Sequence, residues 1–148
     1  IPSKKITHLT APNADLNGFD FEEAILETAD LKMANLESAL LNMVNLNDST
    51  MTDANLTDAH LVGAQLNFVN LENADLTGAW LNDAYLEDAS LKNAMLEKAH
   101  LQGAHLDDAD LTGADLNGVT FNDSTLVRQG QLKLAKNVPE GLWKVALE

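Results

Sequence analysis

Carboxylates are the most numerous side chains in this sequence that could carry out chemistry. The 148 residues include 23 Asp and Glu, four His and no Cys, so thiol nucleophiles, disulfides and zinc thiolates are excluded. Ser38 and Ser90 have no evident His and Asp partners, and no phosphate-binding glycine loop is present. Acid–base catalysis by carboxylates requires a partly buried site that shifts their pKa values. Whether these carboxylates can act in catalysis therefore depends on whether the elements that hold them form a partly buried site.

The charge balance restricts the class of partner. A formal net charge of −14 argues against direct binding to nucleic acid and to anionic membrane surfaces, because both require clustered Lys and Arg. It favours a basic protein partner. No apolar run approaches the roughly 20 residues that span a bilayer. The chain begins at Ile1, which is compatible with a cytoplasmic protein, or with the thylakoid lumen or periplasm if a targeting segment has been removed.

A five-residue rhythm organises most of the chain. A large apolar residue recurs at every fifth position from Leu16 to Leu126, always Leu except for Phe21, Met51 and Phe121. A small residue, usually Ala, stands two positions before it. A period of five fits neither a helix nor a continuous strand. In extended geometry the small and large residues share one side, and the next two residues, rich in Thr, Asn, Asp and Gly, can turn. The pattern predicts a parallel β-solenoid.

The repeated unit A(D/N)LXX resembles the pentapeptide-repeat family. It reads ANLTD at residues 54–58, ADLTG at 74–78 and ADLNG at 114–118, and it runs through 23 consecutive units over residues 14–128. The resemblance implies a right-handed quadrilateral parallel β-helix with four pentapeptides per coil and nearly six coils. We expect residues 1–13 to form an N-terminal lead-in or cap, and residues 129–148 to form a helical C-terminal cap.

The inward positions predict the core and the end caps. Each buried Leu contributes about 1.5–3 kcal/mol. Two inward hydroxyls, Ser49 and Ser124, require a backbone acceptor. Phe19 is too large for an interior coil, so we expect it to close the N-terminal mouth beside Phe21. The leucines predicted to line the middle of the core are Leu56, Leu61, Leu66, Leu71, Leu76, Leu81, Leu86, Leu91 and Leu96.

The tail after Leu126 loses the rhythm and becomes basic. Residues 131–136 can form a helical turn or two, Pro139 breaks it, and Leu142 and Trp143 belong to a second apolar segment. We expect this tail to fold over the last coil as a cap. A dimer interface is the alternative, because Trp and Leu on a terminal segment also suit self-association. Both a monomer and a dimer through the C-terminal segment therefore remain open.

The outward residues suggest where a partner could bind. With four sides per coil, residues 20 apart stack in columns. Two adjoining sides combine exposed apolar residues with eleven acidic residues and a single cation, Arg128. This composition predicts a face for a partly basic protein partner, with ordinary solvated surface as the alternative. The candidate residues of this face are Phe68, Trp80, Tyr85, Asp88 and Asp108.

We expect no metal site and no cofactor. His60 and His100 stack two coils apart, about 9.6 Å by strand spacing, which is too far to share a metal ion. His105 lies on the adjoining side of the same coil as His100. Stacked carboxylates could attract calcium only weakly, because the glycine-rich repeat of calcium-binding β-rolls is absent. These carboxylates are Glu87, Asp88, Asp107 and Asp108.

Two functions follow from the resemblance. The first is a non-enzymatic rigid scaffold or interaction module, as in short cyanobacterial and plastid members whose molecular roles are undefined. The second is a DNA mimic that binds a type II topoisomerase such as DNA gyrase. Residues 14–128 carry 21 acidic and 4 basic residues, a net −17. Over a height of roughly 28 Å this is about one charge per 1.6 Å, close to duplex DNA. The scaffold is favoured, because the array has no loop insertion and the tail is short and basic.

Overall fold

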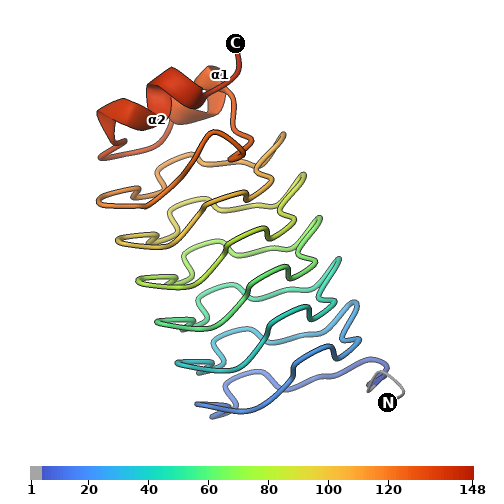
Figure 1. Cartoon of the computed structure of the whole chain (residues 1–148). Coiled ribbons are helices and arrows are strands. Elements are labelled where there is room, and N and C mark those ends of the chain that lie inside the picture. The colour runs from blue at the N-terminus through green and yellow to red at the C-terminus, as the bar shows by residue number, and fades with distance from the viewer. Residues whose placement is uncertain (1–4) are drawn as a thin grey trace.

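The chain coils into a stack of four-sided turns in a computed structural model that describes residues 5–148 (Figure 1). Parallel bridges join residues that are 20 apart, for example Asn55 with Asp75 and His60 with Trp80. Four pentapeptides therefore complete one coil, and each coil stacks on the next. Each side contributes a single bridging residue, because only three residues separate successive corners. Residues 1–4 of the expected lead-in lie outside the described residues.

The corners have the turn chemistry that the sequence indicates. The Ala79 N–H donates to the Leu76 C=O over 3.0 Å and closes one such turn. Within it Gly78 has a φ of 68°, and Asp58 has a φ of 55° at the equivalent place one coil earlier. A positive φ at the third residue of a turn occurs in type II turns, and Gly, Asn and Asp tolerate it best. The Gly78 N–H also donates to the Glu97 C=O over 2.9 Å, so corners as well as sides join the coils.

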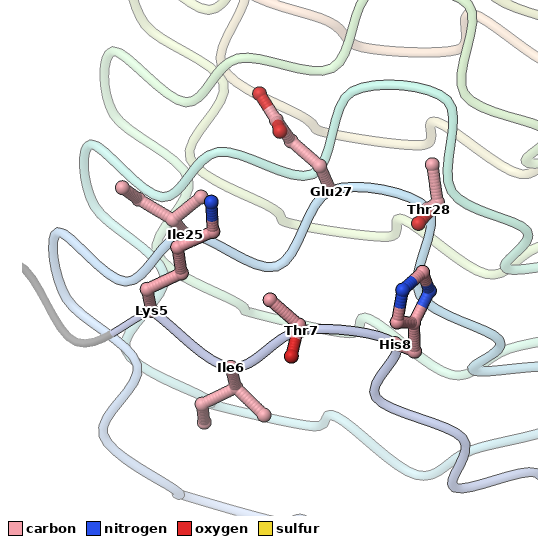
Figure 2. Close-up of a pocket in the computed structure, with 7 residues that line it drawn as sticks. All are labelled: Lys5, Ile6, Thr7, His8, Ile25, Glu27 and Thr28. Atoms are coloured by element: carbon pink, nitrogen blue, oxygen red, sulfur yellow. The ribbon is translucent and has the colours of Figure 1, made fainter.

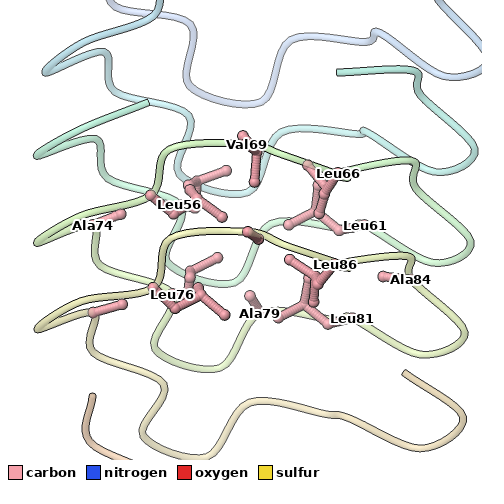
Figure 3. Packing of buried hydrophobic residues seen from close by; sticks show 14 of the residues in the cluster. Leu56, Leu61, Leu66, Val69, Ala74, Leu76, Ala79, Leu81, Ala84 and Leu86 are labelled. Atoms are coloured by element: carbon pink, nitrogen blue, oxygen red, sulfur yellow. The ribbon is translucent and has the colours of Figure 1, made fainter. Parts of the chain in front are cut away.

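Leucine and alanine side chains fill the axis of the stack (Figure 3). Ser49 occupies a small inward position and is 1% exposed. Its hydroxyl donates to the Leu26 C=O over 3.1 Å and accepts from the Ala29 N–H over 3.0 Å, so the buried hydroxyl is fully paired. The nine leucines expected in the middle of the core are each at most 1% exposed: Leu56, Leu61, Leu66, Leu71, Leu76, Leu81, Leu86, Leu91 and Leu96.

The register shifts by one residue near the end of the array, which corrects the expected positions of Ser124 and Leu126. His105 bridges Leu126, so the spacing between bridged residues is 21 there instead of 20. Leu126 therefore takes an outward position and Ser124 is exposed. Thr125 and Val127 are buried in their place, at 2% and 0% exposure.

Hydrogen bonds of Thr125 account for this extra residue. Its hydroxyl donates to the Leu101 C=O over 2.8 Å and accepts from the Asn122 N–H over 3.1 Å. A Thr hydroxyl at the inward position thus satisfies backbone groups of two coils. The extra residue moves the following side chains to opposite faces, because side chains in extended backbone alternate with a period of two. Val127 then packs inward where the five-residue count would place Leu126.

The first coil begins earlier than the repeat pattern indicates. Lys5 bridges Ile25 and Thr10 bridges Asp30, both 20 residues apart, and Leu9 packs partly against the core. Residues 5–13 therefore continue the coil, although their side chains do not follow the Ala and Leu rhythm. Only backbone groups are needed for bridging, so the coil tolerates this loss of pattern at its end.

The two phenylalanines expected at the N-terminal mouth lie against each other. The ring centroids of Phe19 and Phe21 are 5.7 Å apart and stacked. Phe21 packs partly against the core, while Phe19 is 54% exposed. Phe19 thus lies at the open end of the stack, and its role in closing that end remains a prediction.

Two short helices, α1 (Gln129–Leu132) and α2 (Glu140–Val145), lie over the last coil (Figure 1). Leu142 is 1% exposed and Trp143 packs partly against the core. The Gln131 side-chain amide donates to the C=O groups of Leu106 and Ala109 over 2.6 and 2.7 Å. The tail thereby pairs backbone acceptors of the coil beneath it. No helix within residues 5–148 is both long enough and apolar enough to cross a membrane.

Candidate interaction surface

The middle residue of each side points outward, and where it is Asp or Asn it serves the fold. Its side-chain oxygen then accepts from the N–H two residues later, most often on the two sides that contain Asp75 and Asn70. Asp75 accepts in this way from Thr77 over 3.0 Å, and Asn70 accepts from Glu72 over 3.0 Å. Such Asx turns pair a corner N–H that would otherwise lack an acceptor. The side chain at this position is then occupied by its own backbone.

The side that contains Trp80, here called the Trp80 side, lacks this acceptor in four successive coils. The outward residues are Leu40, His60, Trp80 and His100, which bridge one another in order. The Trp80 ring lies between two imidazoles, with centroids 4.1 Å from His100 at 18° and 6.2 Å from His60 at 40°. Trp80 nevertheless remains 42% exposed. The stack holds a large aromatic ring in a fixed orientation on the surface.

The next side, here called the Tyr85 side, also has outward residues that the corner does not use. The Tyr85 ring lies 4.9 Å from the His105 ring at an angle of 44°, and Tyr85 is 41% exposed. At this corner Asn67 takes over the missing role, because its side-chain oxygen accepts from the Glu87 N–H of the next coil over 3.1 Å. Asn47 does the same for the Asn67 N–H over 2.9 Å. Asn67 therefore leaves Tyr85 free of any task in the turn, and Asn47 replaces Gln65 in the same way while donating to the Gln65 side-chain oxygen over 3.4 Å.

The remaining candidate residues form one corner column beyond the Tyr85 side. Phe68, Asp88 and Asp108 occupy equivalent corner positions in three successive coils, and each has a positive φ. Phe68 is 59% exposed. The Arg128 Nε lies 3.9 Å from an Asp108 carboxylate oxygen, and both side chains are largely exposed. The five candidates are thus not one compact cluster: Trp80 lies on one side, Tyr85 on the next, and the column on the far corner.

Three open depressions, an upper, a middle and a lower one, follow one another along the Tyr85 side. The upper one, about 360 Å³, is bordered by Met43, Gly63 and Tyr85. Met43 is 58% exposed, and its thioether sulfur lies over Gly63 in the next coil, where a Cβ would collide with it. The sequence could have shown this pairing, because the two residues are 20 apart. The lower one, about 210 Å³, lies between the first two coils (Figure 2). It is lined by Lys5, Ile6, Thr7, His8, Ile25, Glu27 and Thr28.

A model of pentapeptide repeats matches the chain in eight copies. The matched residues are 13–42, 41–78, 49–88, 70–107 and 84–123, which together cover about three quarters of the sequence. The chain belongs to the pentapeptide-repeat family. Proteins of this family are generally structural or interaction modules without enzymatic activity. Among curated proteins, no match to the chain was found.

Solved structures of pentapeptide-repeat proteins are similar to the chain. One from Nostoc PCC 7120 is 32% identical over 63% of this chain and 84% of its own, with a TM-score of 0.48. One from the Arabidopsis thaliana thylakoid lumen is 29% identical over 88% and 82%, with a TM-score of 0.33. The plasmid-mediated fluoroquinolone resistance protein QnrB1 is 18% identical over 89% and 74%, with a TM-score of 0.49. Membership of the family rests on the repeat match rather than on these superpositions.

Proposed function

We propose that this pentapeptide-repeat protein is a non-enzymatic interaction module that binds a basic protein partner through its Trp80 and Tyr85 sides. One observation carries the proposal: Trp80 and Tyr85 are each about two-fifths exposed, and neither side chain offers the carboxylate or amide oxygen that pairs a corner N–H. Exposed Trp and Tyr with fixed orientations supply large contact areas at low entropic cost, and they dominate binding hot spots.

The charges around these rings support a basic partner. Asp83 lies at the corner between the two sides, and Glu87, Asp88, Asp107 and Asp108 lie at the far corner of the Tyr85 side. Arg128 is the cation that pairs with Asp108 there. Complementary charge raises the association rate and disfavours acidic competitors, while the aromatic rings supply the desolvated contacts. Binding should therefore weaken as salt screens the acidic corner.

A capture experiment from the source cells tests this proposal. The bait proteins are the unaltered chain, a W80A/Y85A double variant and an M95A variant. Met95 is the matched control, because it is an outward residue on a different side and is 45% exposed. We expect a partner that the unaltered chain and M95A capture and that the double variant loses. Retention by W80A/Y85A, or an equal loss with M95A, contradicts the proposal.

The second candidate is a DNA mimic directed at a type II topoisomerase. The net −17 of residues 14–128 favours it, since this charge spreads along a stack about as densely as phosphates along duplex DNA. A mimic at micromolar concentration inhibits DNA supercoiling by gyrase or protects that reaction from inhibitors. A supercoiling assay without any effect at that concentration removes this candidate and leaves the interaction module in place.

A further inference from the structure

Three metal-ligating side chains converge at the corner beyond the Tyr85 side. They are Glu87, His105 and Asp107, and one donor atom from each lies within 4.8 Å of the other two. The His105 Nδ1 is 3.9 Å from a Glu87 carboxylate oxygen. We propose that these residues bind a divalent transition-metal ion, with zinc as the ion to test first. This proposal does not depend on the proposed function.

The repeat geometry explains why these three side chains meet. Glu87 and Asp107 are equivalent residues of neighbouring coils, each directly after an inward leucine, so their side chains stack one coil apart. His105 precedes the inward Leu106 and Asp107 follows it, which places both on the outer surface of the same coil. The ring of Tyr85 lies 4.9 Å from the His105 ring and limits its orientation. Two rigid coils therefore hold the donor set.

The donor chemistry selects a transition metal over calcium. Calcium takes oxygen ligands alone, whereas imidazole suits zinc, copper, iron and nickel. Zinc binds nitrogen and oxygen donors at about 2.0–2.2 Å, so ligand atoms in a tetrahedron lie roughly 3.3–3.6 Å apart. The observed separations of up to 4.8 Å need only a small inward rotation of the side chains. All three residues are half-buried, so their side chains can adjust and a water molecule can take the fourth position.

The five-residue pattern indicates these residues only in other combinations. It places His105 on the side next to His100, and it places Glu87 and Asp107 beside the Asp88 and Asp108 column. The three residues lie diagonally across two coils. His105 is an outward side residue, Asp107 is a corner residue of the same coil, and Glu87 is the equivalent corner residue one coil earlier. The columns of the sequence contain only residues 20 apart, so the convergence of these three side chains depends on their directions in the structure.

Calorimetric titration with zinc tests the site. The full chain is used at pH 7 without a histidine tag, and we expect one zinc ion per chain with micromolar affinity. Mutating an outer-shell residue typically costs 10–100-fold in metal affinity, so losing a ligand should cost at least about tenfold. H105Q, E87Q and D107N should each show that loss. In the unaltered chain, the ¹⁵N signal of His105 Nδ1 should shift on zinc addition.

Two variants separate a built site from diffuse attraction to an acidic protein. H8Q removes an imidazole from the first coil, and D83N removes a carboxylate from the other corner of the Tyr85 side. Both should keep the affinity of the unaltered chain within about twofold. The proposal is overturned if H105Q binds zinc as tightly as the unaltered chain, if H8Q or D83N loses as much as H105Q, or if no binding occurs at millimolar zinc.

Discussion

The middle residue of each side, which points outward, either forms a hydrogen bond that the fold requires or is free of that requirement. Where the position holds Asp or Asn, its oxygen pairs a corner N–H, and Asn55 shows the most complete case. Its oxygen accepts from both the N–H and the hydroxyl of Thr57, over 3.0 and 2.7 Å, and its amide donates to Asn35 over 3.2 Å. Where the position holds Trp or Tyr, no such bond exists. The Asp or Asn of the family sequence A(D/N)LXX therefore meets a requirement of the backbone. Where another residue stands at this position, its side chain does not pair the corner N–H.

This division predicts unequal costs at chemically similar positions. Asn55→Ala leaves a corner N–H without its acceptor and should lower the free energy of unfolding by about 1–2 kcal/mol. Gln65→Ala removes an outward amide that does not pair the corner N–H. Asn47 serves that N–H, and the Gln65 oxygen accepts only a long bond from the Asn47 amide, over 3.4 Å. It should cost no more than about 0.5 kcal/mol. Urea denaturation of both variants measures the difference, and equal costs would contradict this account of the outward position.

Asp110 gives a prediction about pH. Hydrogen bonds from Thr112, first from its side chain and then from its backbone, hold the pKa of this carboxyl below its ordinary value, with a smaller contribution from Lys92. A lowered folded-state pKa means that Asp110 stabilises the fold above its unfolded pKa, about 3.9, and that this stabilisation is lost as the pH falls through the folded pKa.

Thr112→Ala should raise the pKa of Asp110 part of the way to its ordinary value, because the backbone bond remains. Lys92→Gln should raise it less. A titration followed by the carboxyl ¹³C shift of Asp110 reports both changes. A larger effect of Lys92→Gln would show that the ion pair, in which Nζ and a carboxylate oxygen are 3.4 Å apart, outweighs the hydrogen bonds.

At the scale of whole pentapeptides, the five-residue period predicted almost every inward residue. Each pentapeptide forms one side of the coil, so its Leu and Ala return to the core every five residues. It failed where Leu126 and Val127 stand next to each other. Both are apolar, so counting by fives selects Leu126, while the choice is made by hydrogen bonds of Thr125. The candidate face was predictable as columns of residues 20 apart. The hydrogen bond from the Glu87 N–H to the Asn67 side-chain oxygen, which frees Tyr85, was not predictable, because it depends on the direction of the Asn67 side chain.

The shifted register makes adjacent residues respond in opposite ways. Val127→Asp places a carboxylate at a position with 0% exposure and should cost roughly 3–5 kcal/mol, from lost apolar burial and an unpaired polar group. Leu126→Asp changes an outward, half-buried residue and should cost about 1 kcal/mol or less. Thermal and urea unfolding of the two variants provide the comparison. A more severe effect of Leu126→Asp would restore the uninterrupted five-residue count.

At the scale of the molecule, each coil contacts only the coils beside it. The free energy of unfolding of such a stack is close to the sum of the intrinsic stabilities of the coils and of the interfaces between neighbouring coils. The cost of a core substitution therefore depends on which coil contains it. Inner coils have a neighbour above and below. The first coil has one, and its leucines are accordingly less buried: Leu16 is half-buried, whereas Leu76 has 0% exposure. The C-terminal end differs, because α1 and α2 cover the last coil.

This asymmetry gives the final prediction. Leu76→Ala removes a side chain packed by coils on both sides and should cost about 2–5 kcal/mol, since the rigid coils cannot collapse into the cavity. Leu16→Ala makes the same chemical change in the first coil, where solvent already reaches the side chain, and should cost less than half as much. Hydrogen exchange separates local from global effects. Leu76→Ala should speed exchange through the inner coils, while Leu16→Ala should affect residues 5–24 and leave the inner coils protected. Equal costs, or loss of protection throughout with Leu16→Ala, would mean that the stack unfolds as one unit and that end coils are as strongly held as inner ones.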